Sequence, residues 1–305
     1  MKIFKKIKKE NNLRYIYFFG IKILSYRKTH IRYYIKKYIK AKDPLFFNKC
    51  KSKKKEFHID VVIPTTTKDI HKLEKVIPSL NNITHHIDNI FIVSPKSEYV
   101  VEFCKQYKTT FIDENSVLPI TLQEIKYKPQ GISREGWIFQ QLLKLNIDTF
   151  CKNEYILVAD SDTLFNKKQY FIKKEKMVFD CSDEFHLPYF DTLKKLLPIK
   201  KRFPLSFVAH HMLFKKSYLK EMKNEIEKTQ NKPWLNAILD NLHPDETSSF
   251  SEYETYGNWM YQNHKKDMLL REWYNLSTTT KNFETISKST LNKFKTISMH
   301  SYNEE

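Results

Sequence analysis

A short apolar run that ends in two aspartates places the strongest constraint on the fold. The run Tyr155 to Ala159 is followed directly by Asp160-Ser161-Asp162. Five continuous residues of this kind are typical of a strand buried on both faces, as in the centre of a parallel sheet. Such sheets bind ligands at the carboxyl ends of their strands, so the two carboxylates predict a site for Mg²⁺ or Mn²⁺ and a phosphate-bearing ligand. The alternative is an Asx turn that merely ends the strand.

Strand and helix patterns alternate on both sides of this run. Before it, strands are predicted at 61–67, 89–94 and 110–113, with helices at 68–80, 98–107 and from 134 onward. After it come a strand at 177–179, a helix at 189–197, a strand at 206–214, a helix at 216–229, a helix after Ser251 and a short segment at 295–301. This alternation predicts βαβ units and an α/β domain with a mostly parallel sheet flanked by helices.

The scarcity of glycine and the spacing of the cysteines exclude several site types. The chain has only Gly20, Gly131, Gly136 and Gly257, so neither a glycine-rich dinucleotide fingerprint nor a P-loop can be written. The four cysteines are far apart and lack the paired spacing of a metal site. They are interpreted as reduced thiols of a cytoplasmic protein.

The positive charge of the chain is concentrated at its start. The net charge is +18, but residues 1–55 hold 19 of the 53 Lys and Arg residues and only two of the 35 acidic residues. That segment therefore has a balance of +17, and residues 56–305 have a balance of +1. We expect a basic amphipathic helical extension and linker over 1–55, followed by a single catalytic domain over 56–305.

The basic segment favours attachment to an anionic surface. Within 31–40, positions 31, 34, 35 and 38 form an apolar helical stripe with basic residues largely off it. Such a helix suits an anionic membrane, and residues 1–50 are predicted to bind one peripherally. The apolar stretch Tyr15 to Leu24 is interrupted by Lys22 and is too short to span a bilayer. A solvated extension packed on the body is the alternative. Nucleic acid is not an expected partner, because the body is nearly neutral.

The segment from Pro129 to Leu145 combines a predicted helix start with an unusual polar face. Ser133 is the predicted N-cap of a helix that begins at Arg134. One helical face carries Arg134, Trp137, Gln141 and Lys144, a mixture that packing alone does not explain. Arg134 near a helix N-terminus could bind diphosphate oxygens, or it could be a surface arginine beside a packed tryptophan.

Two histidines and two glutamates follow the central run. His210 and His211 lie within a predicted strand, so alternation turns them to opposite faces and at most one faces a ligand. Ser251 is the predicted cap of a helix in which Glu252 and Glu254 point apart. The Ser-x-x-Glu spacing assigns Glu254 to a capping box and leaves Glu252 without a local partner.

Taken in order, these features resemble a GT-A-type nucleotide-sugar glycosyltransferase, most closely the bacterial enzymes of capsule and lipopolysaccharide biosynthesis. The resemblance covers residues 58–300. It is carried by Val62-Ile63-Pro64-Thr65, the Arg134–Lys144 block, Asp160-Ser161-Asp162, His210-His211-Met212-Leu213-Phe214 and Ser251-Glu252-Tyr253-Glu254-Thr255-Tyr256-Gly257.

The resemblance implies roles for these residues. The nucleotide sugar, expected to be UDP-linked, would contact Pro64, Thr65, Thr66, Arg134, Trp137, Gln141, Asp160 and Ser161. A Mn²⁺ or Mg²⁺ ion would be bound by Asp160, Asp162 and His300, and the acceptor side would include His210 and His211. Glu252 and Glu254 are the candidate catalytic carboxylates.

The expected function is therefore metal-dependent sugar transfer to a hydroxyl of a surface glycan or lipid-linked acceptor, on the inner face of the cell membrane. Glu252 is the expected base of an inverting displacement, since a carboxylate can accept the proton of the acceptor hydroxyl. A retaining reaction would need no such base. A competing hypothesis is a non-catalytic membrane- or RNA-binding protein that acts through its basic arm. A metal-dependent phosphoesterase would need more ligands than one Asp-x-Asp and scattered histidines supply.

Overall fold

A five-stranded mixed sheet forms the centre of the protein. The computed structural model describes residues 5–10, 13–18, 21–27, 57–199 and 205–300. The strand order is β11-β7-β4-β5-β6, in which β4, β5, β6 and β7 are parallel and β11 runs antiparallel beside β7. The bounds are β4 (His58–Pro64), β5 (His86–Ser94), β6 (Thr110–Asp113), β7 (Tyr155–Ala159) and β11 (His211–Lys215). The predicted central strand is thus confirmed, with its carboxyl end at Asp160.

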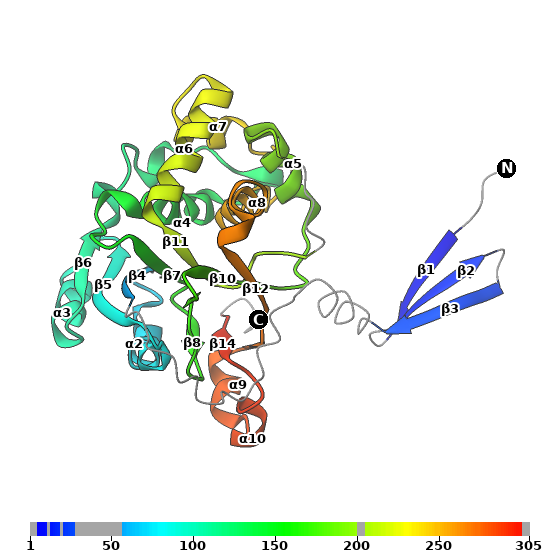
Figure 1. The fold of residues 1–305 in the computed structure, drawn as a ribbon, viewed down its shortest axis with the longest axis horizontal. Helices are drawn as coiled ribbons and strands as arrows, with labels where there is room; N and C mark the ends of the chain where they lie inside the picture. Colours follow the sequence, from blue (N-terminus) through cyan, green and yellow to red (C-terminus); the bar gives the residue numbers. More distant parts are fainter. Residues whose placement is uncertain (1–4, 11–12, 19–20, 28–56, 200–204, 301–305) are drawn as a thin grey trace.

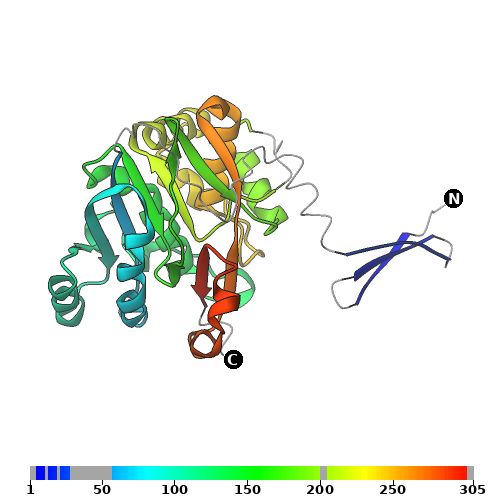
Figure 2. The same cartoon turned by 60° about the horizontal axis from the view of Figure 1, so that its bottom comes forward.

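Helices cover both faces of this sheet. In Figures 1 and 2, α2 and α3 lie on one side, and α4, α6 and α8 lie on the other. The helices are α2 (Leu73–Ser79), α3 (Glu98–Gln106), α4 (Glu135–Leu145), α5 (Leu187–Leu196), α6 (Lys216–Gln230), α7 (Trp234–Asp240), α8 (Glu252–Asn263), α9 (Thr280–Thr285) and α10 (Lys288–Leu291). The α/β class with a mostly parallel, helix-flanked sheet is confirmed.

Two small three-stranded sheets lie beyond the central one. One has the order β12-β10-β9 and the other β13-β14-β8. Their strands are β8 (Thr163–Phe165), β9 (Ile172–Lys173), β10 (Lys176–Cys181), β12 (Met268–Glu272), β13 (Asn275–Thr278) and β14 (Thr296–Met299). Because β8 follows the two aspartates and pairs with β14, this sheet brings the end of β14 to the end of β7.

The core lies where α4 and α8 cover the sheet. Val61, Leu157 and Val158 of the central strands are fully buried, as their continuous apolar runs predict. The α4 stripe predicted from the sequence, Ile138, Leu142 and Leu145, is fully buried as well. Cys104, Cys151 and Cys181 are buried and are not joined by disulfide bonds.

Several predicted boundaries shift in the structure. The helix predicted at 68–80 is divided into a 3-10 turn at Ile70–Lys72, α2 and a 3-10 turn at Leu80–Asn82. The predicted strand 206–214 starts only at His211. Ser133 does not cap α4, because its hydroxyl donates to the Glu135 carboxylate and Arg134 stands at the N-cap position.

The described part of the basic N-terminal segment consists of strands. β1 (Lys5–Glu10), β2 (Leu13–Phe18) and β3 (Ile21–Arg27) form an antiparallel sheet in that order. The prediction of a helical extension is therefore wrong for these residues, where hairpin pairing replaces the helix. The helix predicted within 31–40 lies outside the described residues. Of the helices in the described part of the chain, none has the length and apolar character needed to cross a membrane.

Candidate active site at the carboxyl edge of the central sheet

A buried lysine links the first aspartate to the glutamate of α8. The Lys144 ammonium donates to Asp160 Oδ1 at 2.5 Å and to Glu252 Oε1 at 2.8 Å. Only 4% of the Lys144 side chain is exposed, so its charge depends on these two carboxylates for compensation. The Tyr253 hydroxyl also donates to Asp160 Oδ1, at 3.1 Å, and Lys144 Nζ lies 4.7 Å from the centre of the Tyr253 ring. The carboxyl end of β7 is therefore fixed to α4 and α8 by one charged network.

This network keeps Asp160 ionised. Burial alone would raise the pKa of Asp160, but the Lys144 charge and the His210 hydrogen bond hold it well below its usual range. Burial would likewise lower the pKa of Lys144, and Asp160 and Glu252 raise it well above its usual value. One negative charge therefore stays at the strand end, next to a permanently charged lysine.

The second aspartate faces a histidine that lies 138 positions later in the sequence. His300 Nδ1 is 3.0 Å from Asp162 Oδ2, and His300 is 4% exposed. The pairing of β14 with β8 sets this contact, together with a bond from the Met299 N–H to the Asp162 carbonyl at 2.9 Å. Two ligands of one six-coordinate ion lie about 3 Å apart when each bond is about 2.1 Å long. The pair Asp162–His300 therefore fits two adjacent positions around a divalent cation.

His210 contacts Asp160 and the ring of His300, the histidine that faces Asp162. The backbone of His210 has φ of 54°, an unusual conformation for a residue other than glycine, and its carbonyl accepts the Asp160 N–H at 2.9 Å. Its Nδ1 lies 3.1 Å from Asp160 Oδ2, and its ring lies 4.8 Å from that of His300. Burial would lower the pKa of His210, but the bond to Asp160 raises it above its usual value. Asp160, Asp162, His210 and His300 thus lie together as one group.

His211 does not belong to this group, so its expected place on the acceptor side is corrected. The His211 side chain is 1% exposed, and its Nε2 lies 2.9 Å from Asp180 Oδ2. Arg271 donates to both oxygens of Asp180 at 2.6 Å. The turn in the backbone at His210 sends the two imidazoles apart, and His211 enters a buried ion-pair cluster of the core.

The two glutamates of α8 have different surroundings. Ser251 is the N-cap as predicted, since its hydroxyl accepts the Glu254 N–H at 3.2 Å. The Glu254 carboxylate accepts from the Phe207 N–H at 3.1 Å and from the Asn258 amide at 2.7 Å. Because Glu254 is fully buried with these partners, the expectation that it is a catalytic carboxylate is corrected to a structural role. Glu252 is 3% exposed, and its carboxylate accepts from Lys144, which lies 108 positions away and is not indicated by the local sequence.

The polar face of α4 supports the start of α8. Gln141 Oε1 accepts the Glu252 N–H at 3.2 Å, so this buried side chain caps the helix that carries Glu252. The Arg134 guanidinium donates to the Thr247 carbonyl at 2.6 Å and lies 4.4 Å from the centre of the Trp137 ring. Arg134 must leave the 247–248 loop before it can bind a diphosphate, so this role stays a prediction.

The residues predicted to border the nucleotide lie at the same edge of the sheet. β4 and β7 are parallel neighbours, which places Pro64, Thr65 and Thr66 beside the end of β7. Thr65 is 3% exposed, whereas Thr66 is exposed and donates to Asp69 Oδ2 at 3.0 Å. Ser161 is half-buried between the two aspartates.

Sequence reasoning missed three residues of this site. Lys144 was visible only as part of an odd helical face, and its ion pairs depend on tertiary contacts. Tyr253 carried no local signal. Glu184 is close enough that His210 and His300 act on it electrostatically, and loss of hydration raises its pKa despite their attraction. The place of these three residues in the site depends on how α4, α8 and the segment that carries Glu184 pack together.

Comparison with solved structures finds glycosyltransferases at low similarity. The galactosyltransferase LgtC, solved with donor and acceptor sugar analogues, is 10% identical with a TM-score of 0.44 over 79% of this chain and 86% of that one. TarS of S. aureus is 10% identical, with a TM-score of 0.41 over 80% and 37%. The bifunctional glycosyltransferase WbbM is 13% identical, with a TM-score of 0.45 over 83% and 47%. Because all three scores are below 0.5, the function proposed below rests on the side chains of this chain.

No curated protein matches the chain, whereas the profile of one family does. The profile of this family, described as a family of unknown function and named DUF6492, matches residues 56–305. This match covers the whole of the folded body described above, including each residue of the candidate site. The chain belongs to the family DUF6492.

Proposed function

We propose that this protein is a glycosyltransferase that moves a sugar from a nucleotide-sugar donor to a hydroxyl group of a glycan or lipid-linked acceptor. The observation that carries the proposal is the group Asp160, Asp162, His210 and His300 at the carboxyl edge of a mostly parallel sheet. Ligands of α/β proteins bind at this edge. A nucleoside diphosphate needs a divalent cation and oxygen ligands there, and the group supplies both carboxylate and imidazole donors.

The donor set favours Mn²⁺ over Mg²⁺. Asp162 and His300 would hold the ion. Asp160 would contribute a second negative charge close to it, in addition to that of Asp162. An imidazole ligand suits Mn²⁺ better than Mg²⁺, which prefers an all-oxygen shell. When bound, the ion neutralises the charge that develops on the diphosphate leaving group. The residues themselves orient the site, since Lys144, Tyr253 and His210 all hold the Asp160 carboxylate.

The place of Glu252 leaves two roles to be separated by experiment. As a base, its carboxylate would accept the proton of the acceptor hydroxyl. As a positioning residue, it would act through Lys144, which it contacts at 2.8 Å. Its 3% exposure favours the positioning role in the structure as described, and the base role stays our prediction from the sequence.

The basic N-terminal segment supports a second part of the proposal. Residues 1–55 carry a balance of +17, while the body is nearly neutral. We place the enzyme at the inner face of the cell membrane, where anionic lipids attract such a segment and lipid-linked acceptors are found.

The proposal is tested by a donor screen with the full-length protein. We expect slow hydrolysis of at least one nucleotide sugar, UDP-linked sugars first, in the presence of Mn²⁺ and none after treatment with EDTA. Calorimetry should show UDP binding that needs Mn²⁺. Asp240→Asn is the matched control for the Asp162→Asn variant. It removes an exposed carboxylate of α7 whose partner is Lys232, and it should leave UDP binding unchanged. If no nucleotide sugar is hydrolysed and no nucleoside diphosphate binds with Mn²⁺, the proposal is wrong.

A further inference from the structure

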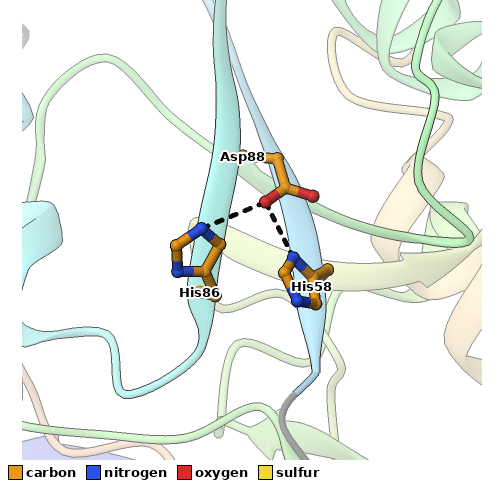
Figure 3. Close-up of side chains that lie close together, drawn as sticks. All are labelled: His58, His86 and Asp88. Carbon is orange, nitrogen blue, oxygen red and sulfur yellow. Dashed lines mark hydrogen bonds and ion pairs between the residues drawn. The ribbon is translucent and has the colours of Figure 1, made fainter.

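A second group of possible metal ligands lies at the opposite end of the central sheet. His58, His86 and Asp88 offer two imidazole nitrogens and one carboxylate oxygen that all lie within 4.8 Å of one another. Figure 3 shows the three side chains converging from β4 and β5. Among the described residues, this is the one group of three or more His, Cys, Asp or Glu side chains that meets this distance.

The strand register explains why these side chains meet. His58 and His86 are paired residues at the first positions of the parallel strands β4 and β5. The register then shifts, so that Ile59 pairs with Ile87 but Asp60 pairs with Asn89. Asp88 is therefore the extra residue of a β-bulge, a feature that redirects a side chain. The bulge places the Asp88 carboxylate over both imidazoles, where Oδ1 lies 2.8 Å from His58 Nδ1 and 3.3 Å from His86 Nε2.

The carboxylate is held in this direction from behind. Asn153 donates to Asp88 Oδ2 at 2.8 Å, and the same amide donates to Asp60 Oδ1 at 3.0 Å. Asp60 is fully buried and also accepts the Lys152 and Asn153 N–H groups at 2.9 Å each. A hydrogen bond that fixes a metal-binding carboxylate is a regular part of metal sites.

We propose that His58, His86 and Asp88 bind a transition-metal ion of the Zn²⁺ type. The donors of a tetrahedral zinc site lie about 3.3 Å apart, which follows from bonds of about 2.0 to 2.1 Å. The His86–Asp88 contact already has this length, and the His58–Asp88 contact needs to open by about 0.5 Å. Two imidazoles and one carboxylate select Zn²⁺, Ni²⁺ or Cu²⁺ over Mg²⁺ or Ca²⁺. The side chains are 52%, 55% and 30% exposed, so an ion and its water ligand can enter.

This site is separate from the candidate active site and does not depend on the proposed function. Six residue steps along β4 separate His58 from Pro64, a distance of about 20 Å at 3.3 Å per residue. The ion would join the first residues of the two central strands. We therefore assign it a structural role in fastening the start of β4 to β5.

The test is calorimetric titration of Zn²⁺ into full-length protein without a polyhistidine tag, after removal of metals with EDTA. We expect a Zn²⁺ site in the wild type that Mg²⁺ does not fill and that is separate from any binding at Asp162 and His300, with a rise in Tm on binding. His86→Ala and Asp88→Asn should each weaken this site by more than about 100-fold. Asn153→Ala, which removes the support behind Asp88, should weaken it by about 10- to 100-fold.

Two controls locate the ion. His71→Ala removes an exposed histidine outside the group and should leave Zn²⁺ binding unchanged. Asp162→Asn should also keep the site, because it acts at the other end of the sheet. If His86→Ala and Asp88→Asn bind Zn²⁺ as tightly as the wild type does, and its Tm rises as before, the proposal is overturned and the three residues form only hydrogen bonds.

Discussion

At the scale of single residues, Asp162 provides the sharpest test of the candidate active site. Asp162→Asn should abolish Mn²⁺-dependent binding of a nucleoside diphosphate, because the substitution removes a charged ligand beside His300. His300→Ala should weaken metal binding less, since one neutral ligand is lost. Calorimetry with UDP and Mn²⁺ measures both effects, and circular dichroism checks the fold. Unchanged diphosphate affinity and metal dependence in Asp162→Asn would contradict the proposal that Asp162 binds the metal ion.

The two α8 glutamates form a matched pair for a second test. Glu252→Gln should lower turnover by at least about 10²-fold with donor binding preserved, the usual effect of losing a general base. If Glu252 is the base, the fall in turnover at low pH seen in the wild type should be absent from Glu252→Gln. If Glu252 only positions Lys144, turnover of the variant is lower but still falls at low pH as in the wild type.

Glu254→Gln is the companion variant. It should cost about 1–3 kcal/mol of stability, because one buried hydrogen bond to Phe207 or Asn258 is lost. Urea denaturation measures this cost. An inactive but fully stable Glu254→Gln protein would show that the roles of the two glutamates are reversed.

At the scale of elements, the approach of α8 to the segment before β11 depends on one glycine. A Cβ added at Gly257 would lie 2.4 Å from Phe207 Cγ and 2.7 Å from Phe207 Cβ. Phe207 is fully buried and cannot move aside freely. Gly257→Ala should therefore destabilise the protein by about 1–3 kcal/mol, as expected for an overpacked core. Urea denaturation measures the effect. Gly136→Ala, on α4 with open space at its Cβ, is the control and should not destabilise the protein.

The ion pair between β10 and β12 makes stability depend on pH. Burial would raise the pKa of Asp180, but Arg271 holds it well below its usual range. The stabilisation is therefore present above the unfolded pKa of about 3.9 and is lost as the pH falls below it. Arg271→Gln leaves a buried carboxylate poorly compensated and should cost about 3–5 kcal/mol at pH 7. Urea denaturation should show a smaller difference from the wild type at about pH 2.5 than at pH 7, because the lower pH lies below the unfolded pKa. An equal difference at both values would contradict this account.

These elements show which features local sequence can predict. The Ser251 cap was predictable because its partner is three residues away, and Asp160 and Asp162 because a buried strand ends there. His211 was misassigned because its partner, Asp180, comes from another strand. Lys144 and Tyr253 were missed for the same reason. The α4 start was misplaced by the local bond between Ser133 and Glu135, which competes with capping.

At the scale of the whole molecule, the charge distribution divides the chain into two parts. Deletion of residues 1–50 should release the protein from anionic vesicles, while Mn²⁺-dependent activity on a soluble acceptor remains. The attraction of the wild type should weaken as salt is added, because exposed charges are screened. Cosedimentation with anionic and with neutral vesicles measures both effects. Equal binding by the full-length and shortened proteins would exclude the membrane role, and tighter binding to RNA would favour the competing class.

The order of strands in the central sheet has a consequence for how the protein is made. β4 lies between β5 and β7, and β7 is synthesised about 90 residues after β4. While the ribosome makes the intervening segment, one edge of an apolar strand has no partner. Unpaired strand edges of this kind associate with other chains. A polypeptide that stops before residue 155 should therefore aggregate in the cell and depend on chaperones, whereas one extended through β11 can close the sheet.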